Sequence, residues 1–262
     1  MSVIPTAVFT AACLTAGPQV ELFAHRGASR DAPENTVAAF QLAWKQHADG
    51  AECDLRITKD GRIVACHDET TKRTAGIELN IAQTDFAQLR TLDVGSFKGA
   101  AFKNERLPLL EELLATIPKG KKIYLEVKCG PEIVPELIRQ LEQNQKPAAE
   151  TPVICFNTAV IAELKRQRPK FPAYLLHNPE KISAKDLVAQ AKSIQADGVD
   201  LKACPELDDA YAQIIREAGL RLDVWTVNDP AEARRLIKLG VQGITTDRPG
   251  FLRESVFGSG DQ

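Results

Sequence analysis

The feature of this sequence that most restricts its fold is a regular alternation of short apolar runs with longer amphipathic segments. Eight runs have the length and residue types of β-strands, at residues 20–24, 51–57, 123–127, 153–156, 173–176, 198–201, 221–227 and 243–246. The segments between them place apolar side chains three and four residues apart, as amphipathic helices do. Strands that alternate with helices in this way pair in parallel, because a parallel pair needs a long crossover connection.

The helices that we expect have recognisable ends. They span residues 35–47, 109–117, 131–145, 159–168, 184–194, 208–218 and 231–239. Gly219 and Gly240 each follow a last helical turn, where glycine readily adopts the left-handed conformation that ends a helix. Asp229 followed by Pro230 is a typical helix start. A helix therefore follows each strand, the last strand being the one open case.

Eight strand–helix units within about 240 residues predict a closed (β/α)8 barrel, the TIM barrel. An open, doubly wound sheet is the competing architecture, but no G-x-G-x-x-G follows the first strand to favour it. Asp60 and Gly61 indicate a hairpin that returns through residues 63–66. The polar, glycine-containing residues 69–106 then interrupt the alternation as a small insertion. We therefore expect the barrel domain at residues 19–258, an N-terminal extension at 1–18 and a tail at 259–262.

The overall composition excludes several classes of protein. A net charge of −2 provides no basic surface for nucleic acid, and no apolar run reaches the ~20 residues needed to span a bilayer. The six cysteines contain no C-x-x-C pair, which favours free thiols in a reducing compartment and hence the cytoplasm. Residues 1–18 are apolar but lack Lys and Arg, so we favour an ordinary extension packed on the domain over a cleaved export leader.

Three acidic residues lie on two of the expected strands. Glu52 and Asp54 are two positions apart, so both side chains project to the same face of their strand, and Glu126 lies near the end of the next barrel strand. In such a barrel the reacting groups gather where the strands end. Three converging carboxylates repel one another and call for a hard cation, Mg²⁺ or Ca²⁺, which prefers oxygen ligands. The alternative is a solvated or salt-bridged barrel rim.

Two of the four histidines lie at the ends of apolar runs beside these carboxylates. His25 ends the first strand and His67 ends the hairpin partner of the second. Two imidazoles that flank a metal suit general acid and base catalysis near neutral pH, so we take both as catalytic. His47 and His177 are interpreted as structural or peripheral, although His177 faces the right way to line the pocket.

Positive and aromatic side chains accompany the histidines. Arg26 and Lys128 bring fixed positive charge to the same end of the barrel, where guanidinium geometry fits phosphate oxygens. Alternatively, each is only an ion-pair partner of the carboxylates. Trp225 and Phe156 at strand ends could contact an apolar part of the substrate, and filling of the core is an equal alternative.

Glu34 and Asn35 open the first helix directly after the His-Arg-Gly loop. Helix capping explains Asn35, and orientation of a metal ligand or of Arg26 is an alternative role for Glu34. Asp247 at the end of the last strand is interpreted as a cap or loop partner and is a weak site candidate.

These residues form motifs that resemble those of the glycerophosphodiester phosphodiesterase family, from about residue 22 to residue 252. The matching motifs are His25-Arg26-Gly27, Pro33-Glu34-Asn35-Thr36, Glu52-x-Asp54, His67-Asp68, Leu125-Glu126-Val127-Lys128, Trp225-Thr226-Val227-Asn228 and Gly243-Ile244-Thr245-Thr246-Asp247-Arg248-Pro249. Each motif alone is weak, but seven in register are specific. A short insertion, and Cys155 in place of the usual Ser before Phe156, depart from the family pattern.

The resemblance implies a TIM barrel with an insertion after the second histidine. It implies a divalent cation bound by Glu52, Asp54 and Glu126, and acid–base roles for His25 and His67. The expected reaction is hydrolysis of a glycerophosphodiester to glycerol 3-phosphate and an alcohol, either by water or through a cyclic phosphate. Alternatives are a related phosphodiesterase, phospholipase C- or D-like, that acts on a lysophospholipid or phosphoinositide, and a barrel that only binds a phosphorylated ligand.

Overall fold

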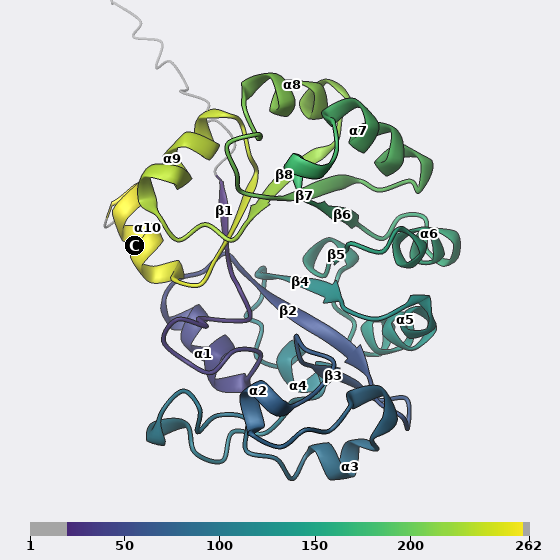
Figure 1. The fold of residues 1–262 in the computed structure, drawn as a ribbon, viewed down its shortest axis with the longest axis vertical. Helices are drawn as coiled ribbons and strands as arrows, with labels where there is room; N and C mark the ends of the chain where they lie inside the picture. Colours follow the sequence, from purple (N-terminus) through teal and green to yellow (C-terminus); the bar gives the residue numbers. More distant parts are fainter. Residues whose placement is uncertain (1–19, 259–262) are drawn as a thin grey trace, which may run out of the picture.

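The computed structural model describes residues 20–258, and these form a closed barrel of eight parallel strands surrounded by helices (Figure 1). The barrel strands are β1 (Glu21–Ala24), β2 (Gly50–Ile57), β4 (Lys122–Val127), β5 (Val153–Cys155), β6 (Ala173–His177), β7 (Gly198–Lys202), β8 (Arg221–Trp225) and β9 (Gly243–Thr246). β1 pairs with both β2 and β9, which closes the ring. The predicted TIM barrel is therefore confirmed, and the open sheet is excluded.

The helices around the barrel lie where the amphipathic segments predicted them, to within a few residues at each end. They are α1 (Val37–Lys45), α4 (Leu110–Leu114), α5 (Val134–Gln143), α6 (Thr158–Gln167), α7 (Ala184–Ser193), α8 (Asp209–Glu217) and α9 (Pro230–Lys238). A further helix, α10 (Pro249–Phe257), follows β9, so the last strand also has a helix after it, which the sequence had left open. It starts with proline, which is tolerated in the first helical turn, and it buries Leu252.

Local chemistry sets the ends of these helices. Side-chain oxygens at five N-caps accept hydrogen bonds from backbone N–H groups of the first turn, at Thr36, Asn157, Ser183, Asp208 and Asp229. Such a cap satisfies a donor that the helix itself leaves unpaired. As expected, Gly219 and Gly240 follow α8 and α9 in the left-handed region, with φ of 74° and 82°. The helix boundaries are thus consequences of the local sequence.

Aromatic side chains fill the middle of the barrel. Phe23 stacks on Tyr124 with 3.8 Å between ring centroids, and Tyr174 packs edge-on against Tyr124. The hydroxyl of Tyr124 donates a hydrogen bond to Asp223 at 2.6 Å, and Arg221 pairs with the same carboxylate. This packing closes the barrel interior, so that polar side chains near the carboxyl ends of the strands remain available for a site.

The segment 69–106 packs beside the hairpin of β2 and β3 (Ile63–Ala65), at the lower edge of Figure 1. It contains the short helices α2 (Lys72–Ala75) and α3 (Phe86–Leu89) and two 3₁₀ turns, η1 (Ile81–Gln83) and η2 (Ala100–Phe102). Its apolar residues form a small core of their own with residues of the hairpin and of the connection to α4, made up of Val64, Cys66, Ile81, Leu89, Leu92, Val94, Leu107 and Leu109. The insertion is therefore better ordered than its polar composition suggests.

The predicted extension at 1–18 and tail at 259–262 lie outside the described residues. Within residues 20–258, no helix has the length and apolar character needed to cross a bilayer. The five cysteines in this part of the chain are free thiols, as expected.

Candidate active site

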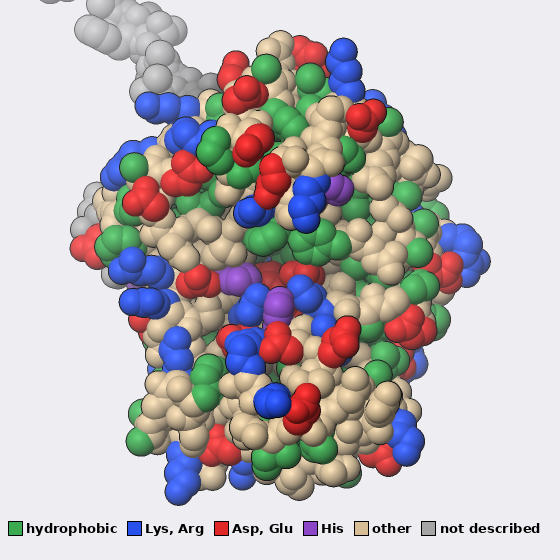
Figure 2. All heavy atoms as spheres, in the orientation of Figure 1, with side chains coloured by type: hydrophobic (Ala, Val, Ile, Leu, Met, Phe, Trp, Pro, Cys, Tyr) green, Lys and Arg blue, Asp and Glu red, His purple; other side chains and the backbone are tan. Residues whose placement is uncertain are grey.

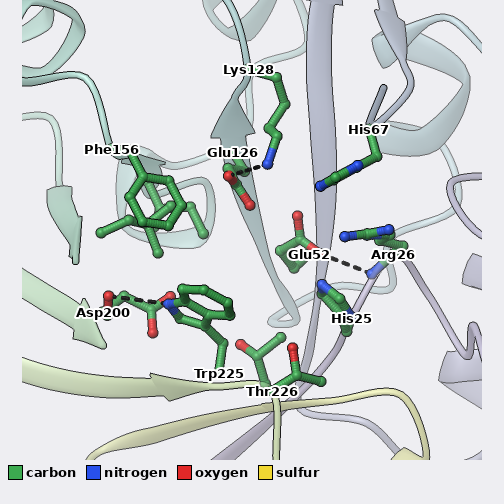
Figure 3. Close-up of a pocket in the computed structure, with 13 residues that line it drawn as sticks. His25, Arg26, Glu52, His67, Glu126, Lys128, Phe156, Asp200, Trp225 and Thr226 are labelled. Carbon is green, nitrogen blue, oxygen red and sulfur yellow. Dashed lines mark hydrogen bonds and ion pairs between the residues drawn. The ribbon is translucent and has the colours of Figure 1, made fainter. Parts of the chain in front are cut away.

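A pocket of about 240 Å³ opens at the carboxyl ends of the barrel strands. It is lined by His25, Arg26, Glu52, His67, Glu126, Lys128, Ile154, Phe156, Leu176, Asp200, Trp225, Thr226 and Thr245. Histidine, basic and acidic side chains gather around this hollow on the face shown in Figure 2. Both histidines, Arg26 and Lys128 lie on one side of it, and Phe156 and Trp225 on the other (Figure 3).

The three predicted carboxylates come together at the pocket, where Glu52 and Glu126 line it and Asp54 lies beside them, fully buried. Asp54 pairs in register with Glu126, and oxygen atoms of Glu52, Asp54 and Glu126 lie within 4.8 Å of one another. All three side chains are buried, which excludes a solvated rim. One oxygen of Glu52 (Oε1) and one of Asp54 (Oδ1) have no hydrogen-bond partner among the described residues. Unsatisfied carboxylate oxygens that converge at this spacing fit the donor set of a hard divalent cation.

The electrostatics of the cluster support the same interpretation. Burial, together with the charges of its two carboxylate neighbours, raises the pKa of Glu52 well above its ordinary value. The pKa of Glu126 is raised by burial and by Asp54. Burial also acts against ionisation of Asp54, but the charges of Arg26 and Lys128 outweigh it and lower the pKa of Asp54. A bound cation would relieve the repulsion that holds the first two pKa values up.

Each pocket histidine is held by a neighbouring aspartate. Nδ1 of His25 lies 2.7 Å from Oδ1 of Asp247, and Nδ1 of His67 lies 2.7 Å from Oδ1 of Asp68. A carboxylate fixes the proton on Nδ1, which leaves Nε2 as the ring nitrogen available for proton transfer. Burial lowers the pKa of His67, against the opposing effects of Asp54 and Asp68. Asp247, which the sequence suggested as a cap or loop partner, does bond its neighbouring loops, and it also holds the ring of His25.

Asp247 is itself tightly bound. Its Oδ2 accepts a hydrogen bond from Asn228 at 2.6 Å, and its Oδ1 accepts another from Ser29 at 3.0 Å. Burial acts against ionisation of this carboxyl, but the hydrogen bonds and the charge of His25 outweigh it and lower the pKa of Asp247 to about 2. The group is thus ionised and fixed at neutral pH.

The His-Arg-Gly loop places Arg26 over the carboxylates in a rarely populated backbone conformation. The φ of Arg26 is 55° and that of Gly27 is 78°. A Cβ atom on Gly27 would lie 2.6 Å from the backbone of Ala39, so only glycine fits there. The backbone N–H of Arg26 donates to Glu52 at 2.9 Å, and its Nε lies 3.1 Å from Oδ2 of Asp54. Such strain persists where the surrounding contacts enforce it, and it is common at functional sites.

The sequence suggested that Asn35 caps the first helix, but it does not. Thr36 is the N-cap of α1, whereas Asn35 has a φ of 57° and turns its side chain toward β2. Its Nδ2 donates to Oδ2 of Asp54 at 2.7 Å, and its Oδ1 accepts the Asp54 backbone N–H at 3.1 Å. Asn35 therefore fixes the orientation of a predicted metal ligand.

Glu34 connects Arg26 to the insertion. This contact matches orientation of Arg26, one of the two roles that the sequence suggested for Glu34. It accepts from Arg26 at 3.0 Å and from Arg73 of α2 at 2.6 and 2.8 Å. Arg73 also donates to Asp68 at 2.7 Å, and this bond, more than any other contact, lowers the pKa of Asp68 to about 2. Our sequence reasoning missed Arg73, since it lies in an irregular segment with no periodic pattern.

The remaining predicted residues lie as follows. Lys128 pairs with Glu126 at 2.7 Å and with Asp54 at 3.6 Å, so its alternative role as an ion-pair partner applies in this structure. Phe156 and Trp225 meet edge-on at 5.7 Å, and Phe156 is 47% exposed, which rules out core filling for it.

The two histidines interpreted as peripheral are not pocket residues. His47 is exposed at the end of α1. His177 bonds the backbone of Asn178 and does not line the pocket. Asp200, by contrast, lines it and had no predicted role.

The chain is similar in sequence to a known family of enzymes. The sequence model of the glycerophosphoryl diester phosphodiesterase family matches residues 25–251. The glycerophosphodiester phosphodiesterase of Caldanaerobacter subterraneus subsp. tengcongensis is 32% identical over 237 residues, which cover 88% of this chain and 95% of that protein. The glycerophosphodiester phosphodiesterase of Bacillus subtilis (strain 168) is 30% identical, with 96% of this chain and 92% of that protein covered.

The fold is shared with solved structures of the same kind. A phosphodiesterase of Oleispira antarctica in complex with the product sn-glycerol-3-phosphate has a TM-score of 0.83 and 27% identity, covering 90% of this chain and 96% of that one. A glycerophosphodiester phosphodiesterase of Agrobacterium tumefaciens has a TM-score of 0.76 and 28% identity, covering 89% and 99%.

Proposed function

Because the chain belongs to the glycerophosphoryl diester phosphodiesterase family, whose members are phosphoric diester hydrolases, we propose that it cleaves glycerophosphodiesters to glycerol 3-phosphate and an alcohol. The observation that carries the proposal is a pocket lined by two histidines and by two carboxylates of a buried cluster of three. Each histidine has its Nδ1 held by an aspartate. The product complex of the Oleispira antarctica relative supports the choice of substrate.

Glu52, Asp54 and Glu126 would hold a divalent cation, Mg²⁺ or Ca²⁺. When bound, such an ion neutralises charge on the phosphoryl oxygens. Arg26 and Lys128 point into the same space and would bind the remaining phosphoryl oxygens.

The two histidines would divide the proton transfers between them. One accepts, at Nε2, the proton of the attacking hydroxyl, which belongs to water or to the 2-hydroxyl of the substrate's glycerol. The other donates its Nε2 proton to the leaving alkoxide oxygen as the phosphorus–oxygen bond breaks. If the 2-hydroxyl attacks, the first product is a cyclic phosphate, which water then opens to glycerol 3-phosphate with the roles of the two histidines exchanged. Asp247 and Asp68 keep each ring in the orientation that points Nε2 at the pocket.

The free thiols of the described chain suit a reducing compartment, and we propose that the enzyme acts in the cytoplasm.

The test is hydrolysis of glycerophosphocholine, glycerophosphoethanolamine and glycerophosphoinositol by protein treated with EDTA, with Mg²⁺ or Ca²⁺ added back. We expect release of glycerol 3-phosphate that depends on the added ion. His25→Ala and His67→Ala should each lower kcat by about 10²- to 10⁴-fold. His177→Ala, outside the pocket, is the matched control. Release of glycerol 3-phosphate from none of the three diesters, with activity on a lysophospholipid or phosphoinositide instead, would overturn the choice of substrate.

A further inference from the structure

Asp200, on β7, is a pocket residue to which the proposed reaction gives no role. Its side chain is 1% exposed, and neither carboxyl oxygen has a hydrogen-bond partner among the described residues. Asp223, which pairs with it in register on β8, differs completely, because it accepts hydrogen bonds from Tyr124 and Arg221. Asp223 therefore has a structural explanation within the barrel, and Asp200 has none.

An isolated carboxyl group in this position destabilises the folded chain, since it gives up hydrogen bonds with water and receives none from the protein. Burial, followed by the negative charges of Asp223 and Glu126, raises the pKa of Asp200 well above its ordinary value. The protonated form can both donate and accept a hydrogen bond. A buried polar group that no protein atom satisfies, and that lines a pocket, indicates a polar ligand group.

The surroundings of Asp200 define what that ligand group can be. Leu176, which pairs with Asp200 in register, Ile154 and Trp225 give the pocket apolar surface. The indole N–H of Trp225 donates to the main-chain oxygen of Asp200 at 3.3 Å. Arg26 lies across the pocket (Figure 3). A ligand with its phosphoryl group near Arg26 would therefore extend a chain with apolar C–H surfaces and one hydrogen-bonding group toward Asp200.

A short polyol matches this description better than a cationic head group. The carboxyl oxygens of Asp200 are buried, which leaves no room for a bulky group beside them, and a hydroxyl is the smallest hydrogen-bonding group of the proposed substrate. A trimethylammonium group is too large for that approach and has no N–H to donate. In every substrate of the proposed reaction, the glycerol carries hydroxyls, whereas the alcohol varies.

We propose that Asp200 is a specificity-determining residue that hydrogen-bonds a hydroxyl of the substrate's glycerol moiety while the glycerol carbons pack against Trp225. The inference rests on the proposed function, because it assigns one end of the proposed substrate to one side of the pocket. Asp200 would thus recognise the glycerol part of the substrate and make no contact with the alcohol.

The experiment compares two diesters with Asp200→Leu and Asp200→Asn, at saturating divalent cation. Glycerophosphocholine has glycerol hydroxyls, and bis(p-nitrophenyl) phosphate has none. With glycerophosphocholine, Asp200→Leu should lower kcat/KM by about 10-fold or more, and Asp200→Asn, which can still bond a hydroxyl, should lower it less. With bis(p-nitrophenyl) phosphate, both variants should stay within about 2-fold of wild type. Equal losses on the two diesters, or no loss on either, would overturn the proposal.

Product inhibition separates this inference from the proposed function. With bis(p-nitrophenyl) phosphate as the reporter, Asp200→Leu should raise the inhibition constant of glycerol 3-phosphate by about 10-fold and leave that of inorganic phosphate unchanged. This holds even if glycerophosphocholine proves a poor substrate, which would count against the proposed function alone. Equal shifts for both inhibitors would refute a role in binding glycerol.

Thermal unfolding provides a check against a structural role. Because Asp200 has no hydrogen-bond partner to lose within residues 20–258, its replacement by leucine should leave the Tm unchanged or raise it. A structural aspartate would behave in the opposite way. A clear drop in Tm for both variants, with rates on the two diesters falling together, would assign Asp200 to the scaffold.

Discussion

Nδ1 of His25 lies 2.7 Å from Oδ1 of Asp247, although 222 positions separate the two residues in the sequence. The bond joins the end of β1 to the end of β9, the two strands that close the barrel. It has the same length as the bond between His67 and its sequence neighbour Asp68. The two histidines are thus oriented alike, one by a contact across the fold and the other by a local one.

Asp247→Asn should lower kcat by about 10²-fold or more, because an amide cannot hold the proton on Nδ1 of His25 as a carboxylate does. The variant retains the shape of the side chain, so substrate binding should change little. Initial rates on glycerophosphocholine check this. Asp31→Asn, which alters an exposed carboxylate, is the control. A kcat within about 2-fold of wild type would contradict the assigned role.

The same residue should make the stability of the fold depend on pH in the acid range. The folded-state pKa of Asp247 is lowered from 3.8 to about 2, so its contribution is fully present above pH ~4 and is lost as the pH falls toward 2. The contribution is at most about 2 kcal/mol, reduced by partial exposure. In urea unfolding of wild type and Asp247→Asn, the difference in unfolding free energy should therefore shrink between pH 5 and pH 3. A difference that stays constant over this range would argue against the shift.

Arg73 should act on the site through Asp68 and Glu34, both of which it binds. In Arg73→Ala, the carboxylate of Asp68 is no longer neutralised by a guanidinium. It should then stabilise the protonated form of His67 more strongly, so the pKa of His67 should rise. The limb of the pH–rate profile that belongs to His67 should then move to higher pH, with kcat/KM lower by about 10-fold. Arg73→Lys should restore the activity only in part, because one ammonium cannot bridge two carboxylates as a guanidinium does.

The control for Arg73 is its neighbour Lys72, an exposed residue that pairs with Glu78. Lys72→Ala should leave both the rate and the pH profile unchanged. If Arg73→Ala lowers the rate but leaves the pH profile in place, its contact with Asp68 does not reach His67.

Asn35 should stabilise the cluster of three carboxylates by holding Asp54. Asn35→Gly keeps the left-handed backbone but removes both hydrogen bonds to Asp54, one of them to a charged group, so the free energy of unfolding should fall by about 2–3 kcal/mol. Asn104→Gly is a matched control, since Asn104 has a φ of 75° and is exposed. Chemical denaturation measures both, and equal effects of the two substitutions would remove the special role of Asn35.

Much of the fold could be predicted because it follows from local pattern. Apolar periodicity fixes where strands and helices lie, and the barrel then gathers the strand ends at one face. Glu52, Asp54 and His67 could be found in this way, since each stands near the end of an apolar run. Phe156 could be placed at the pocket for the same reason, even though its exposure was not evident.

The rest depends on contacts that a linear pattern does not encode. Asn35 stands one position before the true N-cap, and its side chain turns toward β2 from a backbone with a φ of 57°. The partner of His25 lies on the last strand, so no spacing rule connects them. Arg73 acts from an irregular segment. In the sequence, Asp200 looks like an ordinary strand residue. Only the structure shows that its buried carboxyl oxygens have no hydrogen-bond partner among the described residues.

The closure of the barrel by its first and last strands has a consequence for the timing of activity during synthesis. A chain still growing on the ribosome holds Glu52, Asp54 and His67 once its first third has emerged, yet β1 then lacks one neighbour and His25 lacks its aspartate. On the proposed mechanism, turnover starts only after β9 has docked. Onset of hydrolysis would then mark completion of the ring, and a fragment that ends before β9 would contain most of the proposed catalytic groups but be inactive.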